Sequence, residues 1–375
     1  MLNQVIHNAT LRLLKHQWPK FFSLHQKFFV YHQYLAKSTV FLAIENYIIR
    51  ILLSLFHKNQ LLSLPLAQTG REMLNIEFFF KRNKNLLLIL FFVLTQSPVY
   101  HSALAGQDIW LIDTRQTPWN CATETGFEKT VYYQLIDHRW VRSDAETFFE
   151  TQFPDVPLVL FSPGYTSTTS DTVEVGMSLV RLYNPEQNCR TVFWNWPAEK
   201  IRLPLGRDIR EKIAVTEASA VYLAMFLRRL QPESQVCMIG FSFGNRIICD
   251  AVKRLGDDRP DGMRLHLVLT ASATDYCWFA SGSRHGEVPR LAEKILILYN
   301  PADRALQFYP LLYGNGSRPD ALGRFGPPMA RIAPEYRDHI EAINVQLYLG
   351  NRHRTIYYLQ TSVFRQRMND YLFFE

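Results

Sequence analysis

The chain has 375 residues, of which 47% are hydrophobic and 20% charged, and it holds 5 cysteines. This composition excludes a disordered chain, a coiled coil and a disulfide-rich miniprotein. The formal net charge of +7 lies in the leading segment, because residues 1–105 hold 11 Lys and Arg against 3 Asp and Glu, whereas the remainder holds 30 against 31. The globular part is therefore close to neutral, which argues against nucleic acid as a partner.

Residues 1–72 come first, and they are interpreted as upstream sequence read from a start codon assigned too early. Met73 is well placed to be the initiator. The alternatives are an extension that associates with a membrane and a small helical domain. The apolar stretch 39–56 contains Glu45 and Arg50. Charges there cost about 2.5–3.5 kcal/mol each in a membrane-spanning helix, so the stretch is a poor membrane span.

Residues 73–105 carry the pattern of a secretory signal peptide. Lys81, Arg82 and Lys84 precede the apolar run 86–94, and Ala103-Leu104-Ala105 closes the segment. A basic region, a short apolar core and an A-x-A site in this order are typical of such a peptide, and the core is shorter than the about 20 residues that a membrane helix needs. We expect export to the periplasm, the cell surface or the medium. If the segment is not cleaved, the alternative is a membrane-anchored protein.

Residues 106–375 form a single predicted domain, because short apolar runs alternate with helical patterns. Strands alternating with helices favour a mostly parallel sheet covered on both faces. A helix is predicted from about Asp208 to Leu230, with Asp208 as its N-cap. The runs 109–112 and 131–136 are predicted as two further strands, which would form an antiparallel pair. The other predicted strands are Leu158–Phe161, Thr191–Trp194, Val236–Ile239, Leu265–Leu269, Ile295–Tyr299 and Val345–Leu349.

A serine motif lies between one of these strands and a helix. Gly240-Phe241-Ser242-Phe243-Gly244 follows the strand 236–239 and precedes the helical run 245–255. G-x-S-x-G in this context indicates a sharp turn that lifts the serine hydroxyl above the sheet. Each flanking position needs glycine, because a Cβ there would collide with the neighbouring strand or helix. Ser242 is thus a candidate nucleophile, and the N–H of Phe243 a candidate oxyanion donor.

A nucleophilic serine needs a base and an acid that orients the base. Asp303 follows the predicted strand 295–299, and His353 follows the predicted strand 345–349. Both therefore come at the carboxyl ends of strands, where open α/β sheets place their sites. Ser242, Asp303 and His353 also have the chain order expected for such a triad.

Alternatives to both partners remain in the sequence. Asp275 follows the strand 265–269 and is the alternative acid, ahead of Asp320 and Asp338. The other histidines of this part fit the strand pattern less well than His353; they are His138, His266, His285 and His339. The second oxyanion donor is expected from Ser162-Pro163-Gly164-Tyr165, with the N–H of Tyr165 as the candidate and Gly164 allowing close approach of the backbone.

With these residues in place, the stretch from about 158 to 363 resembles the α/β-hydrolase family. It is more closely similar to a group of bacterial, largely planctomycete, hydrolases of unassigned substrate. The resemblance implies an α/β-hydrolase fold, with Ser242 as nucleophile, His353 as base and Asp303 as orienting acid. Pro163 departs from the family, whose members commonly have histidine before the glycine of the oxyanion loop. The resemblance rests on the blocks 162–165, 194–200, 240–246, 299–306 and 350–353.

The site is expected to be comparatively open on the side between the predicted strands 265–269 and 295–299. Only about 25 residues separate Leu269 from Ile295, which is too few for a large lid domain. The connection from Asp303 to Val345 is longer, and long connections are often functional. Its aromatic residues would wall an apolar acyl or alcohol pocket, or would only pack the loop onto the core; they are Phe308, Tyr309, Tyr313 and Phe325.

The predicted serine chemistry needs no cofactor, and no metal is expected, because no His/Cys/Asp cluster has ligand spacing. Cys237 and Cys249 fit buried packing, whereas Cys121 and Cys189 could pair if the protein is exported. We predict a serine hydrolase that acts on acyl esters or another small molecule. The alternative is a non-catalytic binding or surface-assembly protein that retains the fold. The oligomeric state is left open.

Overall fold

The structure, a computed structural model, describes residues 108–182, 188–200, 204–312 and 319–374. The predictions for residues 1–105 lie outside these residues, as does Tyr313 of the predicted pocket. Within the described ranges, no helix combines the length and the hydropathy that crossing a membrane requires.

Nine strands of the described chain form one sheet in the order β3-β2-β1-β5-β4-β6-β7-β8-β9. β1, β2 and β3 pair antiparallel, and every pairing from β1 across to β9 is parallel. The mostly parallel sheet and the antiparallel pairing of the runs 109–112 and 131–136 are confirmed. The strands are β1 (Asp108–Asp113), β2 (Val131–Ile136), β3 (Arg139–Ser143), β4 (Leu158–Ser162), β5 (Arg190–Asn195), β6 (Gln235–Phe241), β7 (Arg264–Thr270), β8 (Lys294–Tyr299) and β9 (Ile340–Asn344).

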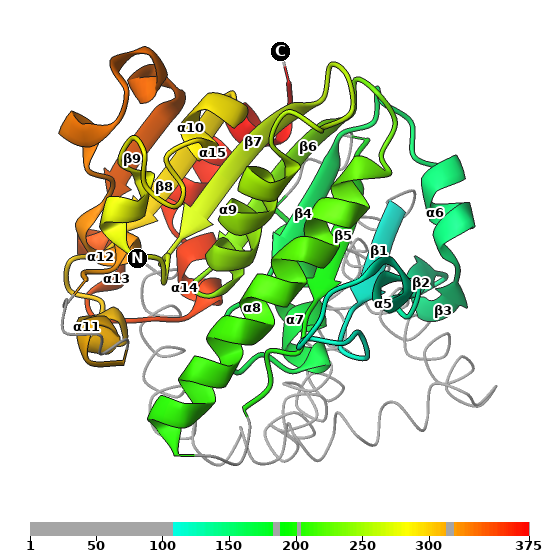
Figure 1. Ribbon diagram of the computed structural model, residues 1–375, viewed down its shortest axis with the longest axis horizontal. Coiled ribbons are helices and arrows are strands. Elements are labelled where there is room, and N and C mark those ends of the chain that lie inside the picture. Colours follow the sequence, from blue (N-terminus) through cyan, green and yellow to red (C-terminus); the bar gives the residue numbers. More distant parts are fainter. Residues whose placement is uncertain (1–107, 183–187, 201–203, 313–318, 375) are drawn as a thin grey trace, which may run out of the picture. The chain divides into compact units, whose positions relative to one another are not determined.

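Helices cover both faces of this sheet (Figure 1). α8 and α9 pack against each other on the face turned toward the viewer, and α7, α14 and α15 lie behind the strands. The helices are α5 (Glu124–Phe127), α6 (Ala145–Glu150), α7 (Thr169–Val180), α8 (Leu205–Arg228), α9 (Gly244–Leu255), α10 (Val288–Leu291), α11 (Tyr309–Leu312), α12 (Leu322–Phe325), α13 (Gln346–Leu349), α14 (Thr355–Leu359) and α15 (Ser362–Leu372).

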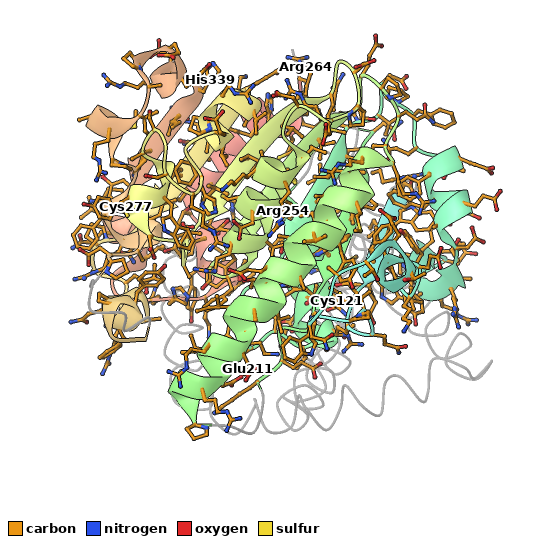
Figure 2. All side chains as sticks on the ribbon, in the orientation of Figure 1. Cys121, Glu211, Arg254, Arg264, Cys277 and His339 are labelled. Atoms are coloured by element: carbon orange, nitrogen blue, oxygen red, sulfur yellow. The ribbon has the colours of Figure 1, made fainter. Side chains whose placement is uncertain are left out.

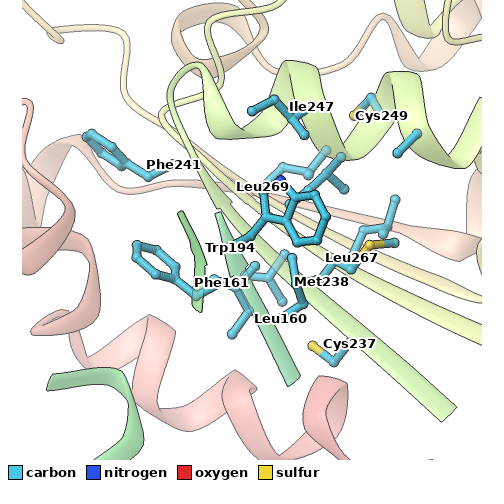
Figure 3. Close-up of a cluster of buried hydrophobic side chains, with 14 of the residues drawn as sticks. Leu160, Phe161, Trp194, Cys237, Met238, Phe241, Ile247, Cys249, Leu267 and Leu269 are labelled. Atoms are coloured by element: carbon cyan, nitrogen blue, oxygen red, sulfur yellow. The ribbon is translucent and has the colours of Figure 1, made fainter. Parts of the chain in front are cut away.

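The core lies between the central strands and the helices on either side. Figure 3 shows Leu160, Met238 and Leu267, from three neighbouring strands, together with Ile247 of α9, and all four are fully buried. Burial of each such side chain stabilises the fold by about 1.5–3 kcal/mol. Because these strands are buried on both faces, their sequences are continuous apolar runs, which the sequence pattern identifies as strands.

The predicted strand Val345–Leu349 is wrong. The last strand is β9, five residues earlier, and residues 346–349 form the short helix α13. Val345 and Leu349 are buried, but Leu347 is 97% exposed and Tyr348 50% exposed, so the run is not continuously buried as a central strand would be. Asn344 ends the strand, because its side-chain Oδ1 accepts the N–H of Gln346 and turns the chain. His353 consequently follows a helix rather than a strand.

Asp208 is not the N-cap of its helix. α8 begins at Leu205, so Asp208 lies inside the first turn, and its side chain is fully buried. Its carboxylate accepts a hydrogen bond from the Tyr165 hydroxyl at 2.6 Å instead of capping a backbone N–H. A carboxylate in the first turn is stabilised by the positive end of the helix dipole. The position therefore favours an acidic residue even though Asp208 does not cap the helix.

All five cysteines are free thiols. Cys189, Cys237 and Cys249 are buried, whereas Cys121 is exposed and Cys277 is half-buried. Figure 2 shows Cys121 and Cys277 on separate parts of the described domain. The structure therefore does not pair Cys121 with Cys189, and Cys237 and Cys249 are buried as predicted.

A buried histidine anchors the C-terminal segment to the start of β7. His266 Nδ1 donates to the backbone oxygen of Tyr371 at 2.9 Å, because a carbonyl can only accept. Its ring stacks on Phe374 with centroids 3.8 Å apart. Burial lowers the pKa of His266 to about 4. The folded protein thus holds this ring neutral under conditions in which an unfolded chain would protonate it.

We expect the free energy of unfolding to decrease as the pH is lowered from about 6.5 to about 4. An unfolded histidine binds a proton below a pH of about 6.5, whereas His266 in the folded protein resists protonation down to a pH of about 4. Between these limits the unfolded state binds more protons, so the free energy of unfolding decreases by about 2 kcal/mol by a pH of about 4.5. Denaturant unfolding at both ends of the window should show a stability gap between wild type and His266→Gln that shrinks at acidic pH. An unchanged gap would contradict this.

Candidate active site

Ser242 occupies a strained turn between β6 and α9. Its backbone φ is 53°, in the left-handed region that side chains rarely adopt, as the G-x-S-x-G motif predicts. The turn is fixed on both sides, because Ser242 N–H donates to Thr270 O and Ala273 N–H donates to Ser242 O. Ser242 is 6% exposed, so the surrounding segments nearly enclose it.

The two glycines of the motif are required by packing. A Cβ on Gly240 would lie 2.1 Å from Asn245 Oδ1 in α9, and a Cβ on Gly244 would lie 2.2 Å from Ser162 O in β4. Both distances are shorter than any real contact, as the sequence predicted. The elbow therefore sits directly against the neighbouring strand and helix, which fixes the position of the serine relative to the sheet.

Asp303, His353 and Ser242 form a chain of contacts. His353 Nδ1 lies 2.7 Å from Asp303 Oδ2, and His353 Nε2 lies 3.3 Å from Ser242 Oγ. Because a carboxylate can only accept, the ring proton lies on Nδ1, and Nε2 is left to accept the hydroxyl proton of Ser242. The second contact is the longer one, and catalytic bonds of this kind tighten when a substrate binds.

The carboxylate of Asp303 is fully buried and held from both sides. Its Oδ1 accepts the backbone N–H groups of Ala305 and Leu306, each at 3.0 Å. Its Oδ2 accepts from His353 and, at 3.5 Å, from the hydroxyl of Tyr358. These donors compensate the burial of the charge and leave one oxygen aimed at the histidine.

Aromatic rings pack beside the histidine. The ring of Phe241 lies 4.9 Å from that of His353 and 5.8 Å from that of Tyr358, measured between centroids. Tyr358 is fully buried, and burial raises its pKa, so it stays a hydroxyl donor. Tyr358 could not be identified from the sequence, because it lies 55 residues from the carboxylate that it contacts and belongs to no motif.

The two predicted oxyanion donors lie beside Ser242. Phe243 precedes the first residue of α9, where N–H groups lack partners within the helix and the dipole favours an anion. The loop that contains Tyr165 passes over the serine, since a Cβ on Gly164 would lie 3.2 Å from Ser242 Cβ. The rings of Tyr165 and Phe243 are 5.7 Å apart. The start of α9 and the loop after β4 therefore both lie next to the serine.

The alternative acid, Asp275, is not brought to His353. Its carboxylate accepts a hydrogen bond from the hydroxyl of Tyr309. Burial raises the pKa of Asp275, and the hydrogen bond from Tyr309 opposes that rise. Of the predicted pocket residues, Tyr309 is buried in this contact, and the neighbouring Phe308 is 49% exposed. The bond ties the long connection after β8 to the loop after β7.

The rival histidines have other partners. His285 is fully buried, and its Nε2 lies 2.9 Å from Asp250 Oδ1 in α9. His339 Nδ1 donates to the backbone oxygens of Pro289 and Ala292. His138 lies in the exposed turn between β2 and β3. Of the five histidines in the described ranges, His353 is the one whose ring contacts both a carboxylate and a serine hydroxyl.

The described residues contain no group of three His, Cys, Asp or Glu side chains placed to hold a metal ion. The chemistry that these contacts allow is proton transfer from a serine hydroxyl to an imidazole, which would make the serine oxygen a nucleophile. N–H groups at two neighbouring loops would stabilise a negative charge that develops on the attacked oxygen.

Comparisons with known proteins give two findings. Residues 143–347 match the model of a family described as alpha/beta hydrolase of unknown function (DUF900). The chain is also similar to the crystal structure of a "Putative hydrolase from Agrobacterium vitis S4", at 12% identity and a TM-score of 0.35, over 64% of this chain and 92% of that one. No curated protein matches.

Proposed function

The chain belongs to a family of α/β-hydrolases of unknown function, and from that premise we propose that it is a serine hydrolase that cleaves acyl esters through an acyl-enzyme on Ser242. The observation that carries the proposal is the continuous contact from Asp303 through His353 to Ser242 at 2.7 and 3.3 Å. The same assignment is supported by the chain order of the three residues, by the strained backbone of Ser242 and by its place before the N-terminus of α9.

In the proposed reaction, Ser242 Oγ attacks the ester carbonyl while His353 Nε2 takes its proton. Asp303 holds the Nδ1 proton and stabilises the imidazolium that results. The N–H groups of Phe243 and Tyr165 donate to the oxyanion of the tetrahedral intermediate. His353 returns the proton to the departing alcohol, which leaves the acyl group on Ser242. Water then attacks this acyl-enzyme with His353 as base, and the carboxylic acid departs.

The long connection after β8 is proposed to border the substrate. The hydroxyl of Tyr309 donates a hydrogen bond to Asp275. Two residues before Asp275, the N–H of Ala273 donates to Ser242 O. The connection is thereby linked to the serine through one short loop. Phe308, largely exposed beside Tyr309, would present an apolar surface to an acyl or alcohol group.

A fluorophosphonate probe tests the proposal, because it reacts only with an activated serine. The wild-type protein should become labelled, and Ser242→Ala should remove the label while leaving the thermal midpoint close to that of wild type. Ser162→Ala is a matched control, because Ser162 is also buried near the elbow but its side chain is not part of the proposed chemistry. A folded wild type that resists the probe and hydrolyses no short p-nitrophenyl ester would instead favour a binding protein that retains the fold.

A further inference from the structure

The loop after β4, residues 163–166, is held at both ends by the segment after β5. The indole Nε1 of Trp196 donates to Pro163 O at 2.9 Å, and the N–H of Thr166 donates to Ala198 O at 2.8 Å. Trp196 and Ala198 are fully buried. The loop therefore takes its position from a neighbouring segment of the chain rather than from its own sequence.

The same loop is also tied to α8 through a side chain. The hydroxyl of Tyr165 donates to Asp208 Oδ2 at 2.6 Å, and Asp208 is fully buried. Lys212, one turn further along α8, donates to Pro197 O at 2.6 Å and so connects the helix to the segment that holds the loop. A buried carboxylate is costly unless it is compensated. Asp208 has the hydrogen bond from Tyr165, an electrostatic interaction with Lys212 and a place in the first turn of the helix.

The backbone of this loop is under strain at Thr166, two residues after Gly164, which lies against the serine. Thr166 has a φ of 74°, which is unfavourable for a β-branched residue. Such a conformation persists only where the surroundings fix it. At Gly164 the backbone lies so close that a Cβ would be 2.8 Å from the ring of Phe241. A small movement of the loop would therefore change the position of the Tyr165 N–H relative to Ser242.

From these contacts we infer that Asp208 and Tyr165 are a positioning pair, whose side-chain hydrogen bond fixes the Tyr165 N–H as an oxyanion donor. The inference rests on the proposed function, because the donor has a role only if an oxyanion forms at Ser242. Donors stabilise a transition state because they are already in place when the charge develops. The Asp208–Tyr165 bond would act on the rate of acylation rather than on substrate binding.

The test is a double-mutant cycle with p-nitrophenyl acetate and a fluorophosphonate as probes. Tyr165→Phe and Asp208→Ala each remove one partner of the bond, and each should lower kcat and the phosphonylation rate about tenfold, since displacement of one donor costs less than the roughly 10²–10³-fold that its removal costs. KM should change less than about twofold, because the donor acts on the transition state and not on the bound substrate. The double variant should lose no more than the larger single loss, since both changes break one bond.

Tyr222→Phe is the matched control. Tyr222 lies on α8, as Asp208 does, and it is buried, but its hydroxyl donates to Pro118 O at 2.6 Å, which is outside the loop 163–166. It should lower the thermal midpoint with kcat within about twofold of wild type. Wild-type kcat in Tyr165→Phe, or losses that multiply in the double variant, would overturn the inference while Ser242-dependent labelling of the wild type upheld the proposed function. A wild type that does not react would overturn both.

Discussion

Replacing Asp303 with asparagine is expected to lower kcat for ester hydrolysis about 10⁴-fold, with little change in KM. The backbone N–H groups of Ala305 and Leu306 both point at Oδ1. In the Asp303→Asn variant the side-chain carbonyl oxygen must take that place, so the amide NH₂ faces His353. It would donate to Nδ1 and move the ring proton to Nε2, leaving no acceptor for the proton of Ser242.

The matched control for this change is Asp275→Asn. Asp275 is the alternative acid in the sequence, and it bonds to Tyr309 rather than to His353. Its substitution should leave kcat within a few-fold of wild type. Equal losses in the two variants, or a larger loss in Asp275→Asn, would show that the acid has been assigned to the wrong carboxylate. Steady-state kinetics with a p-nitrophenyl ester separates these outcomes, provided that circular dichroism shows both variants to be folded.

Replacing Gly244 with alanine is expected to destabilise the fold by about 3 kcal/mol or more and to abolish reaction with the fluorophosphonate. The added Cβ would lie 2.2 Å from Ser162 O and 2.7 Å from Pro163 O. Both are backbone atoms, so no rotamer change can relieve the clash. Either α9 moves away from β4, or the elbow changes shape, and in both cases Ser242 leaves its place beside His353.

Gly206→Ala supplies the comparison, since Gly206 lies in α8 and the nearest atom to its Cβ would be 3.9 Å away. That variant should be neutral or stabilised by up to about 1 kcal/mol, because alanine favours a helix. Denaturant unfolding measures both changes. Gly244→Ala with wild-type stability and wild-type labelling would mean that the elbow is not packed as described.

The fold was predictable where burial is complete on both faces of a strand. β4 to β8 are such strands, and their apolar runs predicted positions correct to within two residues. The edge strands could not be predicted in this way, because they are only partly buried. β9 reads Ile-Glu-Ala-Ile-Asn and is half-buried, so the more apolar run 345–349 is the better match to a buried strand, although Leu347 is 97% exposed. β3, with arginines on an open edge, was not identified.

The candidate site was predictable where a short sequence motif requires a particular backbone conformation. G-x-S-x-G requires a strained serine, and Ser242 has it. Chain order brought Asp303 and His353 into consideration, and the structure places them in contact with each other and His353 with Ser242. Their catalytic roles remain predictions. The contacts of Trp196, Asp208 and Tyr358 could not be predicted, because each side chain bonds to a partner between 33 and 55 residues away and no sequence spacing marks the pair.

The central claim is that an acyl group is carried on Ser242 during turnover. The most direct measurement mixes the protein with one equivalent of p-nitrophenyl acetate, quenches in acid, and determines the intact mass and the modified peptide by mass spectrometry. We expect a burst of p-nitrophenol together with one acetyl group on the peptide that contains Ser242, and no such group in Ser242→Ala. Release of p-nitrophenol with no acetyl group on Ser242, or equal acetylation of Ser242→Ala, would contradict it.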